Sequence, residues 1–423
     1  MTSRVEGHLA VRAFWRSVGV VLTGTVAAQS IPLFGSLVIA RIYAPAEFGL
    51  FSAWLGMVMM AAVVVTGRFE MALAVEADGA PRRFAMVATL STILGVSLVF
   101  TLIAGIGYFL GGLPDQAKPV MIILFVPATL LAGVTNTWQA WAAAEGNYRG
   151  LSWIRISQAF VVTVTQIGAG LISPTANGML VGHVFGLGVG IGFAMYVMPI
   201  KLCNIISDKV GFWANLKAFW LNQRRFPMLA LPADTINAAS GQLPLLLIAS
   251  RFGAEVSGLF ALTMRVLGAP IGLLGAAILD VFKRTAASSY RDRGHCREEY
   301  VRTFWLLAAG GSMLVFGVIV AAEHFFVVAF GEPWRQAGVI AIWLIPMFAL
   351  RFVASPLSYV FYIADKQHVD LGWQCSLLAM TLSAFMLPSS FESSIKFYSG
   401  GYSLLYIVYA ILSYHHSKGR QVW

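Results

Sequence analysis

Apolar stretches of about twenty residues recur along the whole chain, and they constrain its fold more than any other feature of the sequence. A helix of about 20 residues is long enough to cross the hydrocarbon core of a membrane, which is about 30 Å thick. Backbone polar groups inside that core must be satisfied within their own segment, so such stretches form helices. The sequence therefore predicts an all-α polytopic membrane protein.

The composition supports this interpretation and leaves little room for a soluble fold. Apolar residues make up 58% of the chain and charged residues only 11%, whereas about 25% of the residues in an ordinary globular domain are charged. The net charge of +10 comes from basic residues in the short loops between apolar stretches, a pattern typical of topology determinants. The sequence has no basic, aromatic-rich domain, so we expect no nucleic-acid partner.

We expect about twelve membrane spans. They cover residues 18–40, 48–67, 84–110, 119–143, 151–172, 178–199, 227–250, 257–282, 303–322, 336–363, 370–388 and 397–414. An even number of spans places both termini on one side of the membrane. Twenty lysines and arginines lie on that side and five on the other. Basic residues concentrate in cytoplasmic loops, so both termini are predicted to be cytoplasmic.

Two loop motifs recur about half a chain apart. An Arg, a Glu and then Gly-Leu-Phe follow the first span, starting at Arg41, and follow the seventh span, starting at Arg251. An acidic residue trailed by Leu and Trp at identical spacing occurs at Glu145 and at Asp365. Both pairs fall at matching span numbers, which indicates a parallel duplication. Its pseudo-axis would run along the membrane normal, with a central cavity and its site between two pseudo-symmetric lobes.

The duplication predicts two six-helix lobes, residues 1–200 and 227–423, joined by a cytoplasmic linker at 201–226. Apolar and aromatic residues recur in this linker at helical spacing next to basic ones, namely Phe212, Trp213, Leu216, Phe219 and Trp220. That pattern favours a short amphipathic helix in the headgroup region. An extended linker is the alternative.

Four arginines fall inside or at the edge of the spans: Arg68, Arg155, Arg265 and Arg351. A charge within the membrane normally faces a cavity or a partner. We interpret the four as lining a cationic, water-filled cavity for an anionic headgroup, because the guanidinium fork matches phosphate oxygens. The alternative pairs Arg68 with Glu70 and lets Arg155 reach the cytoplasmic surface.

Other polar residues inside the spans are candidates for coupling or for polar support of the site. Glu70 and Asp234 are intramembrane acids, and His183 either relays protons or packs within its helix. Gln29 and Asn237 either bind sugar hydroxyls or bridge helices. The sixth span also carries a row of glycines at every fourth position from 178 to 190, which close helix packing explains.

The sequence shows no catalytic motif, so we expect no enzyme activity. It contains no Walker A loop, GxSxG, HExxH or paired His/Asp cluster. The cysteines Cys203, Cys296 and Cys375 have no metal or redox spacing. We therefore expect no metal or cofactor, and transport would draw on the substrate gradient or on a proton or sodium gradient.

Several motifs of the chain resemble those of a known family, the Wzx-type polysaccharide (O-antigen) flippases of the multidrug/oligosaccharidyl-lipid/polysaccharide (MOP) exporter superfamily. The motifs that carry the resemblance are Arg41-Ile-Tyr-Ala-Pro-Ala-Glu-Phe-Gly-Leu-Phe, Arg68-Phe-Glu-Met-Ala-Leu-Ala, Arg155-Ile-Ser-Gln, Phe226-Pro-Met, Phe330-Gly-Glu-Pro-Trp-Arg-Gln-Ala-Gly and Arg351-Phe-Val-Ala-Ser-Pro-Leu-Ser. Their order and spacing over some 300 residues make the resemblance specific.

The resemblance implies two six-helix lobes around a cationic cavity in a bacterial inner membrane. It implies that an undecaprenyl-diphosphate-linked oligosaccharide is turned from the cytoplasmic to the periplasmic leaflet for surface polysaccharide synthesis, with proton coupling. Membrane lipids, a polysaccharide polymerase and a chain-length regulator are the further partners it implies. Related lipid II flippases use cavity arginines, and Arg68 and Arg265 occupy comparable spans. The chain departs from some superfamily members by lacking an extra pair of spans.

Two other functions compete with a flippase. A multidrug or small-molecule exporter of the same fold would line its cavity with acids for cationic cargo, whereas arginines outnumber the mid-membrane acids here. A membrane glycan polymerase or ligase would carry a large periplasmic loop, whereas the longest periplasmic segment expected here is 323–335.

Overall fold

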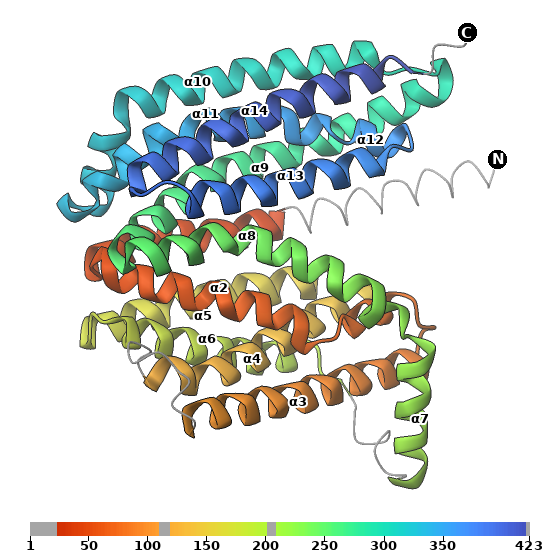
Figure 1. The fold of residues 1–423 in the computed structure, drawn as a ribbon. Coiled ribbons are helices and arrows are strands. Elements are labelled where there is room, and N and C mark those ends of the chain that lie inside the picture. Colours follow the sequence, from red (N-terminus) through yellow and green to blue (C-terminus); the bar gives the residue numbers. More distant parts are fainter. Residues whose placement is uncertain (1–22, 110–118, 201–208, 420–423) are drawn as a thin grey trace. The chain divides into compact units, whose positions relative to one another are not determined.

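The computed structural model describes residues 23–109, 119–200 and 209–419, and every long element among them is a helix. Ten of these helices are long and apolar enough to cross a membrane. They are Thr23–Ile42, α2 (Pro45–Val65), α3 (Ala80–Phe109), α4 (Pro119–Ala144), α5 (Tyr148–Ile172), α6 (Ala176–Val197), α9 (Ala254–Arg293), α10 (Arg297–Phe330), α11 (Arg335–Leu357) with the short α12 (Val360–Ile363), and α14 (Phe391–Ser417). Figure 1 labels most of them along the ribbon.

Two further long helices, α8 (Leu231–Phe252) and α13 (Gln367–Met386), lie at the predicted seventh and eleventh spans. Both are less apolar than the ten, because α8 carries polar residues such as Asp234 and Gln242 and α13 carries Asp370 and Gln374. A long helix thus lies at each predicted span, and the all-α polytopic fold is confirmed. Residues 18–22 and 110 of the predicted spans lie outside the described residues.

Several helices run past the apolar segments that marked them in the sequence. Helix α9 continues to Arg293 and α10 begins at Arg297, so both extend well beyond the predicted ends at residues 282 and 303. The extra turns carry charged residues. Hydropathy marks only the part of a helix that suits lipid, whereas the backbone hydrogen bonding of the helix continues into the headgroup region and water.

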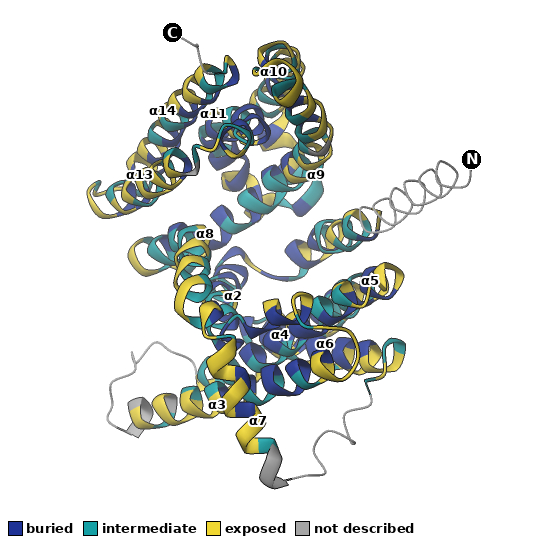
Figure 2. Cartoon of the chain, turned by 90° about the vertical axis from the view of Figure 1, so that its right-hand side faces the viewer, coloured by how far each residue is buried: buried dark blue, intermediate teal, exposed yellow. Residues whose placement is uncertain are grey.

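The chain divides into two compact units, Met1–Gln242 and Leu243–Trp423, called the N-unit and the C-unit below. The division falls inside α8, whereas the duplicated motifs start the second lobe at residue 227. The predicted lobe boundaries therefore remain a prediction. Each unit has its own buried helices, α4 among them in the N-unit and α11 in the C-unit (Figure 2).

The N-unit depends on close packing between α5 and α6, where the row of glycines lies. Gly182 is buried, and a Cβ added to it would lie 2.8 Å from the carbonyl oxygen of Thr165 on α5. The Thr165 hydroxyl in turn donates a 2.7 Å hydrogen bond to the carbonyl oxygen of Gly182. The glycines therefore permit a backbone-to-backbone approach, as small residues do between membrane helices.

We expect Gly182→Ala to destabilise the N-unit by about 1–3 kcal/mol, since the added methyl group would push against backbone rather than a movable side chain. Gly188→Ala on the same helix is the matched control, because nothing lies within 4 Å of its Cβ position and alanine is the better helix former. Thermal unfolding of the purified variants should show a lowered midpoint for Gly182→Ala alone. Equal midpoints would contradict this view of the α5–α6 contact.

The linker between the predicted lobes contains α7 (Lys209–Asn222), so this part is not extended; residues 201–208 lie outside the described residues. In Figure 1, α7 lies crosswise to the long helices of the N-unit. Phe219 packs against Phe69 and Phe84, with ring centroids 5.6 and 6.3 Å apart. Trp213 on the other side of α7 is exposed. The helix is thus present, and its amphipathic placement in the headgroup region stays a prediction.

The first repeated motif holds the end of a neighbouring helix in each unit. In the N-unit, the Glu47 carboxylate accepts a hydrogen bond from the Ala176 amide at the start of α6. In the C-unit, Arg251 donates to the carbonyl oxygen of Phe385 and, at 3.3 Å, to that of Pro388, at the end of α13. Carboxylates suit helix N-termini and cations suit C-termini. These motif residues thus have structural roles.

The second repeated motif lies at two similar turns. Gly146 after α4 has φ +67° and Asp365 after α12 has φ +59°. In both turns the next amide donates to the carbonyl five residues earlier, at 3.0 and 2.7 Å. This is the turn that ends many helices with a left-handed residue. The two turns are alike, but the left-handed residue follows Glu145 in one and is Asp365 itself in the other, one position apart in the alignment of the motif. The duplication stays a prediction.

A row of buried tyrosines on α14 forms much of the core of the C-unit. Tyr398, Tyr402, Tyr406 and Tyr409 recur at helical spacing and are all buried. The Tyr409 hydroxyl donates to the carboxylate of Asp370 on α13, which also accepts a 2.9 Å hydrogen bond from the Gln374 side chain. A buried phenol normally finds such a partner. The row thereby ties α14 to α13.

Candidate functional site

Arg68 lies at a sharp reversal of the chain after α2. It adopts a left-handed backbone conformation with φ +59° and precedes a short 3₁₀ helix, η1 (Phe69–Ala74), whose apolar residues are mostly buried. Its guanidinium contacts Glu70, with Nη1 2.9 Å from Oε1, and Asp234 of α8, with Nη2 2.7 Å from Oδ2. The packed turn fixes the backbone, and the two carboxylates fix the side chain. We call these three residues the Arg68 cluster.

The Arg68 cluster is half-buried, and two of its polar atoms lack hydrogen-bond partners in the described part of the chain. Glu70 is buried, whereas the side chains of Arg68 and Asp234 are 25% and 35% exposed. Glu70 Oε2 and Arg68 Nε have no hydrogen-bond partner in the described part of the chain. With both acids ionised the cluster carries one negative charge in excess. Burial disfavours such uncompensated charge.

The predicted pairing of Arg68 with Glu70 is therefore present, and Asp234 is an additional partner that local sequence spacing did not reveal. Asp234 is distant from Arg68 in sequence, and only the fold of the N-unit brings α8 beside the end of α2. In this conformation Arg68 is neutralised by carboxylates.

Arg155 on α5 has a different environment, made of neutral groups. Its Nε donates to the side-chain oxygen of Gln139 on α4 at 3.1 Å, and its Nη1 donates to the Thr25 hydroxyl on the helix Thr23–Ile42 at 3.0 Å. Gln29, one turn from Thr25, is exposed. We call Thr25, Gln29, Gln139 and Arg155 the polar belt of the N-unit. These contacts orient Arg155 without neutralising its charge, which is the condition for binding an anion.

Arg265 lies on α9 of the C-unit, on the side opposite to the contact with α11. Thr263, two residues earlier, is buried and donates a 3.0 Å hydrogen bond to the Ala337 carbonyl oxygen of α11. Two residues turn an α-helix by about 200°, so Arg265 projects away from that contact. It is partly exposed. A charge on that side needs a water-filled space or a partner rather than lipid.

Arg351 lies on α11 of the C-unit, which packs against α9, α10 and α14. Its neighbours Phe352 and Val353 are buried, whereas Arg351 itself is exposed. Arg265 and Arg351 therefore come from two helices that pack together. A single cavity that contains all four arginines stays a prediction.

The two other candidates, His183 and Asn237, lie on α6 and α8. His183 on α6 is buried, with its ring 5.6 Å from that of Phe51 and 6.1 Å from that of Trp54 on α2. This environment fits a packing role. Asn237 is exposed on α8, close to one turn beyond Asp234.

The cysteines were the remaining candidates for redox or metal chemistry. Burial raises the pKa of the Cys296 thiol to about 12, so this thiol remains protonated at physiological pH. Cys375 is exposed, and Cys203 lies outside the described residues. Within the ranges that the structure describes, no group of three His, Cys, Asp or Glu residues is placed to hold a metal ion.

The fold matches solved membrane transporters over nearly its whole length. It aligns with the lipid II flippase MurJ in an inward closed conformation at a TM-score of 0.67 and 10% identity, covering 92% of this chain and 86% of that one. It aligns with an inward-facing multidrug resistance MATE family transporter of the MOP superfamily at 0.62 and 13% identity, covering 92% and 93%. The chain thus has the fold of transporters and flippases rather than of enzymes.

Comparison of the sequence identifies the family of the chain in addition to its fold. The model of the family described as polysaccharide biosynthesis protein matches residues 38–338, and the chain belongs to this family. It is 20% identical over 208 residues to the teichuronic acid biosynthesis protein TuaB of Bacillus subtilis (strain 168), a match that covers 45% of this chain and 43% of TuaB. The match therefore spans less than half the length of that curated relative. The resemblance to polysaccharide flippases is confirmed for family and fold.

Proposed function

We propose that the protein is a flippase that moves an undecaprenyl-diphosphate-linked oligosaccharide repeat unit from the cytoplasmic to the periplasmic leaflet for surface polysaccharide synthesis. The observation that carries this proposal is Arg155, a guanidinium held within a span by the neutral side chains of Gln139 and Thr25. A charge oriented in this way is ready for an anionic headgroup. Membership of the polysaccharide biosynthesis family and the transporter fold support the cargo and the activity.

The proposed substrate carries its negative charge on a diphosphate, next to sugar hydroxyls. Arginine recognises phosphate oxygens through parallel N–H donors, and glutamine side chains both donate to and accept from hydroxyls. The polar belt offers both kinds of group on neighbouring helices of the N-unit. Arg265 and Arg351 are the proposed contribution of the C-unit to the same headgroup.

The Arg68 cluster is the proposed coupling site. A proton on Glu70 or Asp234 would remove a carboxylate charge that Arg68 now pairs with, and Arg68 would become available to an anionic substrate. Such a change in pairing links ion binding to substrate binding, which alternating access by coupled transport requires. The orientation with both termini in the cytoplasm of a bacterial inner membrane, and contacts with a polymerase and a chain-length regulator, belong to the same proposal.

Export of a small cationic drug is the second candidate, because the MATE fold is shared. A cation exporter needs intramembrane acids available to its cargo. In the N-unit the acids Glu70 and Asp234 are both engaged by Arg68, whereas the charge of Arg155 is held by the neutral side chains of Gln139 and Thr25. The cation oriented without a carboxylate favours the anionic cargo.

The direct test is leaflet accessibility in liposomes that contain the purified protein and a defined polyprenyl-diphosphate glycan. We expect the protein to expose glycan from the inner leaflet to an external lectin or glycosidase, whereas protein-free vesicles expose only the outer half. Arg155→Ala should slow this exposure by about tenfold or more, because it removes a charge-assisted contact of about 1.5–3 kcal/mol. Equal exposure with and without protein would overturn the proposal.

A further inference from the structure

An apolar groove in the C-unit lies between α10, α11 and α14 and has a volume of about 430 Å³. Its floor includes the buried Tyr300, Val353 and Tyr406, and its rim includes the exposed Trp305 and Ile411. The lining is almost entirely apolar or aromatic, and the volume lies in the range of about 300–1,000 Å³ for small-molecule sites. The groove is open along one side, since its rim residues are exposed.

The length of the groove matches one leaflet of a membrane. On α14 its lining runs from Tyr406 to Tyr414, a distance of about 12 Å at 1.5 Å per residue. Half of a hydrocarbon core of about 30 Å is about 15 Å. With the termini in the cytoplasm, as the charge distribution predicts, this is the cytoplasmic leaflet. A hydrocarbon chain of that leaflet fits the groove.

One end of the groove carries two cations. The Tyr414 hydroxyl accepts a 3.1 Å hydrogen bond from Arg297 Nε, and the Lys418 ammonium lies 4.8 Å from the centroid of the Tyr414 ring. Both cations are exposed. Among the residues that the structure describes, neither has an acid within 4.0 Å. Their charges are therefore oriented by an aromatic residue and not cancelled.

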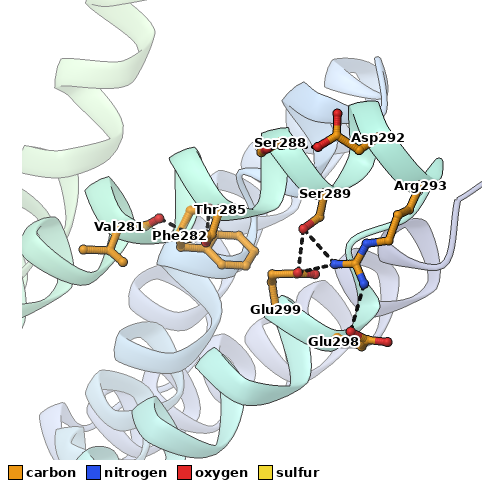
Figure 3. A network of polar contacts seen from close by, with 9 residues as sticks. All are labelled: Val281, Phe282, Thr285, Ser288, Ser289, Asp292, Arg293, Glu298 and Glu299. Atoms are coloured by element: carbon orange, nitrogen blue, oxygen red, sulfur yellow. Dashed lines mark hydrogen bonds and ion pairs between the residues drawn. The ribbon is translucent and has the colours of Figure 1, made fainter. Parts of the chain in front are cut away.

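The nearby acids are already engaged by another arginine. Arg293 at the end of α9 donates to Glu298 at 2.9 Å and also binds Glu299, while Ser289 donates to Glu299 at 2.5 Å (Figure 3). This network closes the turn between α9 and α10. It holds the two carboxylates next to Arg297 in sequence against a different cation, so neither of them pairs with Arg297.

We propose that this groove is a binding site for an anionic glycerophospholipid of the cytoplasmic leaflet, with one hydrocarbon chain between α10, α11 and α14 and the phosphate at Arg297 and Lys418. Charge complementarity selects the headgroup, and the apolar lining holds the chain without selecting its length. The site lies wholly within the C-unit and involves none of the four intramembrane arginines. The proposal therefore goes beyond the proposed flippase activity, and only the choice of leaflet rests on the orientation proposed with that function.

The test is native mass spectrometry of the purified full chain with phosphatidylglycerol and with phosphatidylcholine. We expect the wild type to retain phosphatidylglycerol preferentially. Arg297→Ala combined with Lys418→Ala should weaken that retention by about 25-fold, from roughly fivefold for each basic residue near an anionic headgroup. Ala410→Trp, which fills the groove from α14, should reduce retention of both lipids.

Lys283→Ala is the matched control, because Lys283 also lies over a tyrosine ring of the C-unit, 5.1 Å from the centroid of Tyr359, outside the groove. This variant should retain phosphatidylglycerol as the wild type does. Equal retention of the two lipids by the wild type, or an equal loss in Lys283→Ala, would overturn the proposal. So would displacement of phosphatidylglycerol by a lower concentration of polyprenyl phosphate, since the groove would then be a substrate site.

Discussion

Arg68→Ala is expected to abolish surface glycan assembly and to lower the stability of the protein. The change removes the cation that pairs with Glu70 at 2.9 Å and with Asp234 at 2.7 Å. Breaking a buried ion pair by removing one partner costs about 3–5 kcal/mol, and the lower figure applies because Asp234 remains partly exposed. The loss of glycan alone would not distinguish misfolding from a lost binding contact.

A second variant separates these two effects. In the triple substitution Arg68→Ala, Glu70→Gln and Asp234→Asn, no uncompensated charge remains, so we expect the thermal midpoint to return toward that of the wild type. Translocation in liposomes should nevertheless stay absent, because neither the proposed phosphate contact nor the proposed proton acceptors are present. Arg68→Lys keeps a charge but loses the guanidinium fork, and we expect it to retain part of the activity.

The measurements are the melting temperature of the purified variants and glycan exposure in the leaflet assay. If the triple variant translocates as the wild type does, Arg68 serves only to pair the two acids, and the coupling role proposed for the Arg68 cluster is wrong. If Arg68→Ala is both stable and active, the ion pairs of Arg68 contribute little to stability or to translocation.

Much of the fold could be predicted because each membrane crossing requires an apolar segment of about 20 residues, which is visible in the sequence. Each predicted span has a helix, and the aromatic spacing of the linker correctly predicted α7. Helix ends were less predictable: α9 and α10 extend into water, where apolar content no longer marks a helix. The break between α11 and α12 was missed, because residues 336–363 are mostly apolar on both sides of the turn near Ser358, so this turn changes the hydropathy little.

The sequence predicted which residues belong to the candidate site, but not which residues they contact. A charged side chain inside the membrane is energetically unfavourable unless it faces water or a partner, so the sequence alone identifies the four arginines as candidates. The pairing of Arg68 with Asp234, and of Arg155 with Thr25, joins residues more than a hundred positions apart, and local spacing carries no signal for such contacts. The groove next to Tyr414 was also missed, because its lining comes from three helices and consists of ordinary apolar residues.

Arg265→Ala is expected to leave the C-unit folded and to block glycan translocation. The side chain projects from the side of α9 opposite to Thr263, whose hydrogen bond to Ala337 joins α9 to α11, so its removal should not disturb that packing. A charge-assisted contact to a phosphate is worth about 1.5–3 kcal/mol, which corresponds to a loss of about 10- to 150-fold in binding. We expect Arg351→Ala on α11 to have an effect of the same direction.

The comparison should be made in cells for surface glycan and in liposomes for leaflet exposure, with membrane levels of each variant determined in parallel. Arg291→Ala is the control, because it removes an exposed arginine from the C-terminal end of the same helix and should leave glycan unchanged. Lysine at 265 that restores translocation would show that charge suffices, whereas failure of lysine would indicate bidentate binding of the diphosphate. Normal glycan in both Arg265→Ala and Arg351→Ala would contradict the cationic-cavity mechanism, since the C-unit would then contribute no arginine to the headgroup.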